Sequence, residues 1–187
     1  VILVQTGKRP TVVSNGSPTA SMDGIGACCR DGDIVYWVGS VITTVSAVLT
    51  CTGVKVFQFD LSTDTWDSGA SHAPPTPYYQ TTIPGTLYKL LLLSAGSMLL
   101  LFNGARENVS GQDYARIYSA TFDGSTFGGA TMLPDQTGTA VHYIFTDALV
   151  DAGGDIHLLY AIDDSGTEFR CHRTYDGSVV STSRSQS

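Results

Sequence analysis

The chain has little of several features that would assign it to a familiar class. Only 14% of its 187 residues are charged, and the net charge is -7. Its ten lysines and arginines form no basic run, so neither nucleic acid nor an anionic membrane surface is an expected partner, because both are bound through clustered cations. The four cysteines form no CxxC pair and the four histidines are scattered. We therefore expect no metal site and no cofactor.

The cysteines leave the redox compartment open. Cys28 and Cys29 are neighbours, so in a strand their side chains would point to opposite faces. One of them could form a disulfide with Cys51, or these residues and Cys171 could all be free thiols. The sequence does not choose between these alternatives.

A run long enough to cross a membrane is also missing. The most apolar stretch, Leu87 to Phe102, has 16 residues and contains Ser-Ala-Gly-Ser near its middle, whereas a membrane helix needs about 20 apolar residues. Leucine favours helices, but the central turn divides the stretch into two runs of strand length. Runs that are apolar on both faces are typical of strands buried on both sides. We predict a hairpin within a core, and no membrane insertion.

An internal repeat is present instead. Three blocks combine a glycine turn with an apolar strand: "GDIVYWVGS" from Gly32, "GSMLLLFNG" from Gly96 and "GDIHLLYAI" from Gly154. A second strand follows each block and ends in an aromatic residue and aspartate, at Asp60, Asp123 and Asp176. No stretch has helical periodicity. The repeat predicts an all-β chain built from similar units.

Each unit is predicted to contain four strands. The expected strands are 22–30, 33–43, 54–60 and 65–71, then 78–93, 97–103, 115–123 and 127–133, then 142–151, 155–162, 168–176 and 178–183. Repeated four-stranded units are typical of β-propellers, which have about four to eight blades. We therefore expect 1–187 to be one β-propeller region, as a partial propeller or as half of a six-bladed ring. Its units are approximately 15–76, 77–135 and 136–187, with 1–14 from a preceding or closing blade; a β-sandwich is the alternative.

Two segments resemble the sialidase-like, BNR-repeat β-propellers. In "FTDALVDAGGDIHLLYAID" the strand pair around His157 is similar to a pattern of that family, and "YSATFDGSTFGGATMLP" is similar to its Asp-box through Asp123, Gly124, Thr126 and Phe127. "FDLSTDTWD" also resembles a kelch blade ending. The resemblance implies that the Asp-boxes lie opposite the ligand-binding face.

The aspartates of these motifs have a structural explanation. Asp-Gly favours a tight turn, the carboxylate can accept hydrogen bonds from nearby backbone, and an aromatic residue can pack beneath. We therefore expect structural roles for the residues of this kind, which are Asp60, Trp66, Asp123, Phe127 and Asp176.

Candidate ligand-binding residues lie in loops expected at the other face, because loops on a rigid scaffold often bind ligands. They comprise Arg106, Glu107 and Asp113 in the polar segment "NGARENVSGQDYA", Asp163 in "DDSG", and Tyr78, Tyr79, His142 and Tyr143 in the segments that join units. Aromatic rings and carboxylates suit a sugar. Alternatively, the tyrosines pack the mouth of the central channel of the propeller, and Arg106 with Glu107 forms a solvated surface pair. We expect His157 to lie in the core or at a blade interface, with its hydrogen bonds satisfied.

These residues favour a non-catalytic module that binds glycans or a surface polysaccharide. One alternative is a fragment of a sialidase-like glycoside hydrolase, although the chain has only two glutamates and Arg116, Arg170 and Arg173 are expected on outer strands. Another is a structural propeller of a virion or secreted complex. We expect an extracellular or virion-associated location and a carbohydrate ligand. A homo-oligomer or further blades from a longer chain could complete the ring.

Overall fold

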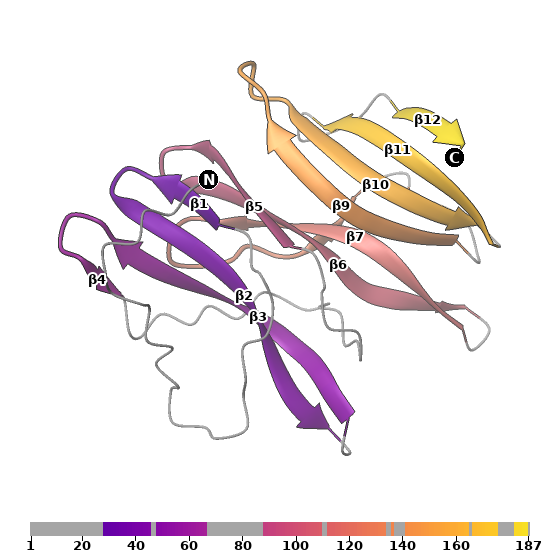
Figure 1. The fold of residues 1–187 in the computed structure, drawn as a ribbon, viewed down its shortest axis with the longest axis horizontal. Helices are drawn as coiled ribbons and strands as arrows, with labels where there is room; N and C mark the ends of the chain where they lie inside the picture. The colour runs from indigo at the N-terminus through magenta and orange to yellow at the C-terminus, as the bar shows by residue number, and fades with distance from the viewer. Residues whose placement is uncertain are drawn as a thin grey trace.

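A computed structural model describes residues 28–45, 48–66, 88–109, 112–133, 136, 141–164, 166–175 and 182–186. In this part of the chain every regular element is a β-strand, so the predicted all-β class is confirmed. Three antiparallel sheets of four strands follow one another along the sequence (Figure 1). In each sheet the strands neighbour one another in chain order.

Each of the twelve strands overlaps one predicted strand, but several bounds differ, most of all where β3 and β6 are longer than predicted. The first sheet contains β1 (Cys28–Asp31), β2 (Ile34–Val45), β3 (Val48–Asp60) and β4 (Thr65–Trp66). The second contains β5 (Tyr88–Ser94), β6 (Ser97–Val109), β7 (Gln112–Phe122) and β8 (Thr131–Met132). The third contains β9 (Val141–Val150), β10 (Ile156–Asp164), β11 (Thr167–Tyr175) and β12 (Thr182–Gln186).

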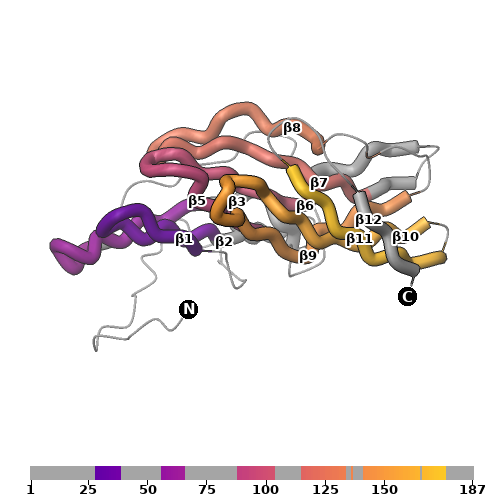
Figure 2. The backbone as a smooth tube through the Cα atoms, turned by 90° about the horizontal axis from the view of Figure 1, so that it is seen from above, coloured from indigo at the N-terminus to yellow at the C-terminus, as the bar shows by residue number. Residues whose placement is uncertain are grey.

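The leucine-rich stretch forms the β5–β6 hairpin, as predicted. Ser94 pairs with Ser97 across an exposed turn in which Gly96 has a positive φ of 70°. The second sheet packs against both of the others (Figure 1), and Figure 2 shows the same sheets from above. Leu100 packs in a core shared with the first sheet, whereas its neighbour Leu101 packs in a core shared with the third. Both leucines are fully buried.

The two contacts between sheets use the same pair of faces. Along a strand, backbone groups alternate between the two neighbouring strands, and the side chains alternate between the two faces in step. In each sheet, the residues of the second strand (β2, β6 or β10) whose backbone groups bond to the first strand have side chains on one face, which we call face 2. The remaining residues of that strand have side chains on the opposite face, which we call face 1. One backbone hydrogen bond in each sheet shows toward which neighbouring strand a residue bonds, and strand alternation then assigns the other residues. Leu61 N donates to Asp33 O, Gly128 N donates to Thr121 O, and Asp151 N donates to Asp155 O.

By this assignment, face 2 of one sheet meets face 1 of the next in both cases. Tyr36 lies on face 2 of the first sheet and contacts Phe122 on face 1 of the second. Leu101 lies on face 2 of the second sheet and packs in one core with Leu158 on face 1 of the third. In addition, β1 lies against β5 and β5 lies against β9, so first strands are neighbours at both contacts. The same pair of faces is therefore used at both contacts, although β5 lies against β1 and β2 of the first sheet whereas β9 lies against β5, β6 and β7 of the second. None of the sheets closes on itself.

Polar side chains also hold the sheets together. The side-chain amide of Asn103 on β6 donates to the backbone oxygen of Tyr143 at 2.8 Å and accepts from the backbone nitrogen of Phe145 at 3.1 Å. This amide therefore forms with β9 the pair of hydrogen bonds that a neighbouring strand would form. Between the first two sheets, Gln58 donates to the Gly124 oxygen and Gly96 N donates to the Asp31 carboxylate at 2.6 Å. These bonds fix the position of each sheet on the next.

Candidate functional site

The alternating strand directions give the molecule two distinct ends. The β2–β3, β6–β7 and β10–β11 connections lie at one end, which we call the hairpin end. The β1–β2, β3–β4, β5–β6, β7–β8 and β9–β10 connections lie at the other, which we call the turn end. The predicted binding residues with described backbone lie at or beside the hairpin end, whereas the aspartate turns lie at the turn end.

At the hairpin end, the third sheet carries a row of titratable side chains. Asp163 pairs with His142 on one side and with Glu168 on the other, so all three side chains project from the same face. His142 Nδ1 accepts a hydrogen bond from Ala115 N of β7 at 3.3 Å. Asp163 also has a structural role, because it accepts a bond from Gly166 N at 3.1 Å within the turn. The second and third sheets therefore meet beside an imidazole and two carboxylates.

The sequence predicts a long polar loop over 103–115, and this expectation is wrong. Strand β6 continues to Val109 and β7 begins at Gln112, so the segment is an extended hairpin. Arg106 and Glu107 fall in β6 at an irregular point of the ladder between Gly104 and Glu107. Asp113 pairs with Asn108. Polar residues with moderate strand propensity can extend a ladder once a core strand fixes its register.

Not every predicted residue can be placed. Tyr78 and Tyr79 lie outside the described residues, and only the backbone is described for Arg106, Glu107 and Asp113. Tyr143 is described, but its ring is buried in the core between the second and third sheets. It lies beside the Tyr160 ring and under the Arg116 guanidinium, whose central carbon is 5.4 Å from the ring centroid. The Tyr143 ring is therefore a core side chain with no open face for a sugar.

Two arginines that the sequence places on outer strands belong to the core. Arg116 is 1% exposed and donates to the backbone oxygens of Ala115 and Val141. Arg173 is 6% exposed and lies over the Tyr160 ring. A buried guanidinium is tolerated when it is hydrogen-bonded and covers an aromatic face. Strand alternation identifies the face on which these residues lie, but not that another sheet covers it.

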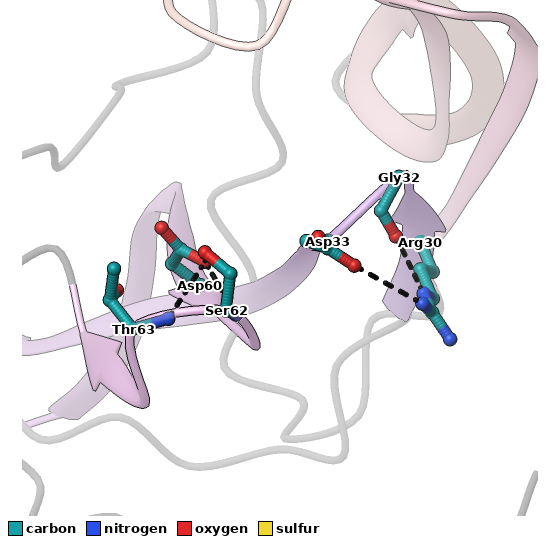
Figure 3. A network of polar contacts seen from close by, with 6 residues as sticks. All are labelled: Arg30, Gly32, Asp33, Asp60, Ser62 and Thr63. Atoms are coloured by element: carbon teal, nitrogen blue, oxygen red, sulfur yellow. Dashed lines mark hydrogen bonds and ion pairs between the residues drawn. The ribbon is translucent and has the colours of Figure 1, made fainter.

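The turn end confirms the structural role predicted for Asp60 and Asp123, whereas Asp176 lies outside the described residues. Asp60 accepts bonds from Ser62 N at 2.8 Å and from Thr63 N at 3.3 Å (Figure 3). Asp123 accepts bonds from Ser125 N and Thr126 N and from both hydroxyls of these residues. These bonds hold the pKa of the Asp123 carboxyl well below its usual range, because they favour the ionised form. The ring of Phe127 packs at 4.6 Å from that of Phe122 beneath the turn.

A hydrogen-bonded chain on the third sheet was not expected from the sequence. His157 was predicted to lie in a core or interface, but its side chain is 30% exposed. Its Nε2 lies 3.1 Å from the Asp151 carboxylate, and its Nδ1 lies 3.1 Å from Nε2 of His172. The bond from His157 is the main cause that lowers the pKa of Asp151. The Asp151 carboxylate accepts a hydrogen bond from Nε2–H of His157, and the contact of His157 Nδ1 with His172 Nε2 extends the chain to a second imidazole.

The two histidines border a shallow pocket of about 290 Å³ on the outward face of the third sheet. Leu149, Leu159 and Ala148 form its apolar part, and Asp147 closes one side. Lys89 of β5 holds the Asp147 carboxylate at 2.8 Å. His157 and His172 lie 15 residues apart, and only the β10–β11 register brings them together. Sequence spacing alone therefore gave no signal for this cluster.

Four further findings concern metal ligands, membrane helices, cysteines and similarity to known proteins. Among the described residues no group of three or more His, Cys, Asp or Glu side chains could hold a metal ion. The same part of the chain has no helix with the length and hydrophobicity that a membrane span needs. Cys28, Cys29 and Cys171 form no disulfide. No known protein family and no curated protein matches the sequence.

Proposed function

We propose that the three sheets are successive blades of a β-propeller that binds glycans at its hairpin end. Four-stranded meanders, neighbouring first strands and the repeated contact of face 2 with face 1 support the propeller arrangement. The resemblance to BNR-repeat propellers in the two sequence segments supports it independently. In this arrangement the hairpin end gathers residues from two adjacent blades.

The observation that carries the binding proposal is the convergence of polar groups at that end. His142, Asp163 and Glu168 form one row on the third sheet. The hydrogen bond from Ala115 N to His142 joins this row to the β6–β7 hairpin, which also contains Arg106 and Glu107. Carboxylates, an imidazole and a guanidinium can exchange hydrogen bonds with sugar hydroxyls. At the turn end, by contrast, the Asp60 and Asp123 carboxylates are already engaged by their own turns.

A glycan array with the purified chain tests this proposal. We expect the wild type to bind a subset of glycans and the combined variant Arg106→Ala, Glu107→Ala, His142→Ala to lose that binding. Ser62→Ala, at the turn end, is the matched control and should retain it. The proposal fails if the wild type retains no glycan, or if the triple variant binds as the wild type does while circular dichroism shows an unchanged fold.

A second candidate function is a structural propeller within an assembly. The observation that favours it is the exposure of Leu149 (57%), Leu159 (49%) and Ile144 (44%) on the third sheet. Apolar side chains that gather on one sheet face indicate a surface that another molecule covers. The apolar patch adjoins the proposed glycan-binding row, because Ile144 and His142 lie on the same face of the third sheet in neighbouring rows.

A further inference from the structure

The outward face of the third sheet combines an apolar centre with polar edges. The strand register places Ile144, Ala161 and Arg170 in one row, and Asp147, Leu159 and His172 in the next. His142, Asp163 and Glu168 lie beyond the first row, and the His157–Asp151 pair lies at the other edge. Protein interfaces have this composition, with apolar side chains at the centre and charged ones at the rim.

This surface is the only face 2 that no other described sheet covers. Face 2 of the first sheet packs against the second sheet, and face 2 of the second packs against the third. His157 and Leu159 bond toward β9, because Asp155 does so two residues earlier, and they therefore lie on face 2 of the third sheet. By repetition of the same contact, its partner would be a face 1 of another four-stranded sheet.

The chain itself carries a suitable face 1 at its other end. Val35 and Trp37 lie on face 1 of the first sheet, because they bond toward β3, and Phe59 and Phe57 are their cross-strand partners. All four side chains are half-buried, and they lie opposite the side that packs on the second sheet. One copy of the chain thus offers an aromatic face 1 and an aliphatic face 2 at opposite sides of its three sheets.

Charges on the two faces are complementary at the turn end. Arg30 pairs with Val35, so it lies on face 1 of the first sheet, and its side chain is 63% exposed beside Asp33 (Figure 3). The third sheet carries the Asp151 carboxylate at its own turn end. A contact that repeats the existing ones would bring the two turn ends together, as Asp31 and Gly96 already meet across the first contact. Arg30 of one copy would then approach Asp151 of another.

We propose that a second copy of this chain covers the third sheet, with its first sheet on Leu149 and Leu159, and that the two copies close head to tail. A head-to-tail contact forms a ring when its rotation closes. Two copies would supply six four-stranded sheets, within the range of about four to eight blades in propellers. The proposal rests on the propeller arrangement above but not on glycan binding.

Light scattering after size-exclusion chromatography, over a series of concentrations, tests the proposal. We expect the wild type to have the mass of two chains. Leu159→Asp and Arg30→Asp should each give the mass of one chain, because each damages one partner of the same contact. Met132→Asp changes a side chain of similar exposure (41%) on β8 and should leave the two-chain mass intact. Circular dichroism of each variant checks that the fold persists.

Mixing the two disruptive variants identifies the geometry. A mixture of Leu159→Asp and Arg30→Asp chains retains one undamaged contact in each mixed pair, so two-chain particles should reappear. A one-chain wild type would overturn the proposal, as would a two-chain Leu159→Asp variant. An Arg30→Asp variant that associates like the wild type would also overturn it, because the third sheets would then pair with each other. Glycan retention by a one-chain wild type would separate this failure from a failure of the binding proposal.

Discussion

Burial of the middle sheet on both faces can be tested with two adjacent leucines. Leu100 and Leu101 are each fully buried, but they belong to different cores. Replacing leucine by alanine removes three carbon groups, worth about 2.4 kcal/mol at roughly 0.8 kcal/mol for each. The cavity left behind adds to this loss, and buried Leu→Ala changes cost about 2.7–5 kcal/mol in total. We therefore expect each single variant to lower the free energy of unfolding by about 3 kcal/mol or more.

Urea unfolding measures this change. With a slope of about 2 kcal/mol per molar urea, a loss of 3 kcal/mol lowers the midpoint by about 1.5 M. Leu93→Ala is the matched control in the same hairpin, because Leu93 is 40% exposed, and it should change stability by no more than about 0.5 kcal/mol. In a two-layered sandwich one of the two adjacent leucines would face solvent. A loss below about 1 kcal/mol for either Leu100→Ala or Leu101→Ala would refute the three-layered packing.

Three further predictions concern the turns and the thiols. Gly124 has a φ of +91°, and a Cβ there would lie 3.0 Å from the Tyr36 hydroxyl, so Gly124→Ala should cost about 1–3 kcal/mol. A double-mutant cycle with Tyr36→Phe should then show a coupling of at least about 0.5 kcal/mol, and no coupling would contradict the contact between the first two sheets. The lowered pKa of Asp123 stabilises the fold above its ordinary value of 3.8, and this contribution is lost as the pH falls below that value. Thermal unfolding should therefore show Asp123→Ala less stable than the wild type at pH 7, with the difference shrinking in acid; a constant difference would exclude this cause. Burial raises the pKa of the Cys29 thiol to about 12, whereas Cys28 is exposed, so iodoacetamide at pH 8 should label Cys28 first in the folded chain, as mass spectrometry can check. Equal labelling rates would contradict the burial of Cys29.

The sequence was most informative where local pattern and tertiary packing agree. The Ser94–Ser97 turn and its two apolar arms identified a hairpin buried on both faces, because only a sheet between two others can bury adjacent leucines such as Leu100 and Leu101. The roles of Asp60 and Asp123 also followed from sequence, since an aspartate turn is closed by atoms within a few residues. Predicted strand ends were less accurate at the 103–115 segment, where pairing continues beyond the apolar core.

Candidate binding residues were only partly predictable. His142 and Asp163 could be proposed as site residues because both are polar and follow or precede strands, and the register makes them cross-strand neighbours. Burial of Tyr143 under Arg116 could not be predicted, since it depends on how the second sheet covers the third. The Asp151–His157–His172 chain was missed for a similar reason, because His157 and His172 are 15 residues apart and become neighbours only through the β10–β11 ladder.

By itself the sequence determined the all-β class, the three four-stranded units and the aspartate turns, because strand alternation and turn chemistry act over a few residues. Only the tertiary structure decided which face of each sheet is covered. Alternation divides a strand into two faces, but the packing of one sheet on the next chooses between them. That choice buries Tyr143 and Arg116, and it leaves Leu159 and His157 exposed on the surface that we propose a second copy covers.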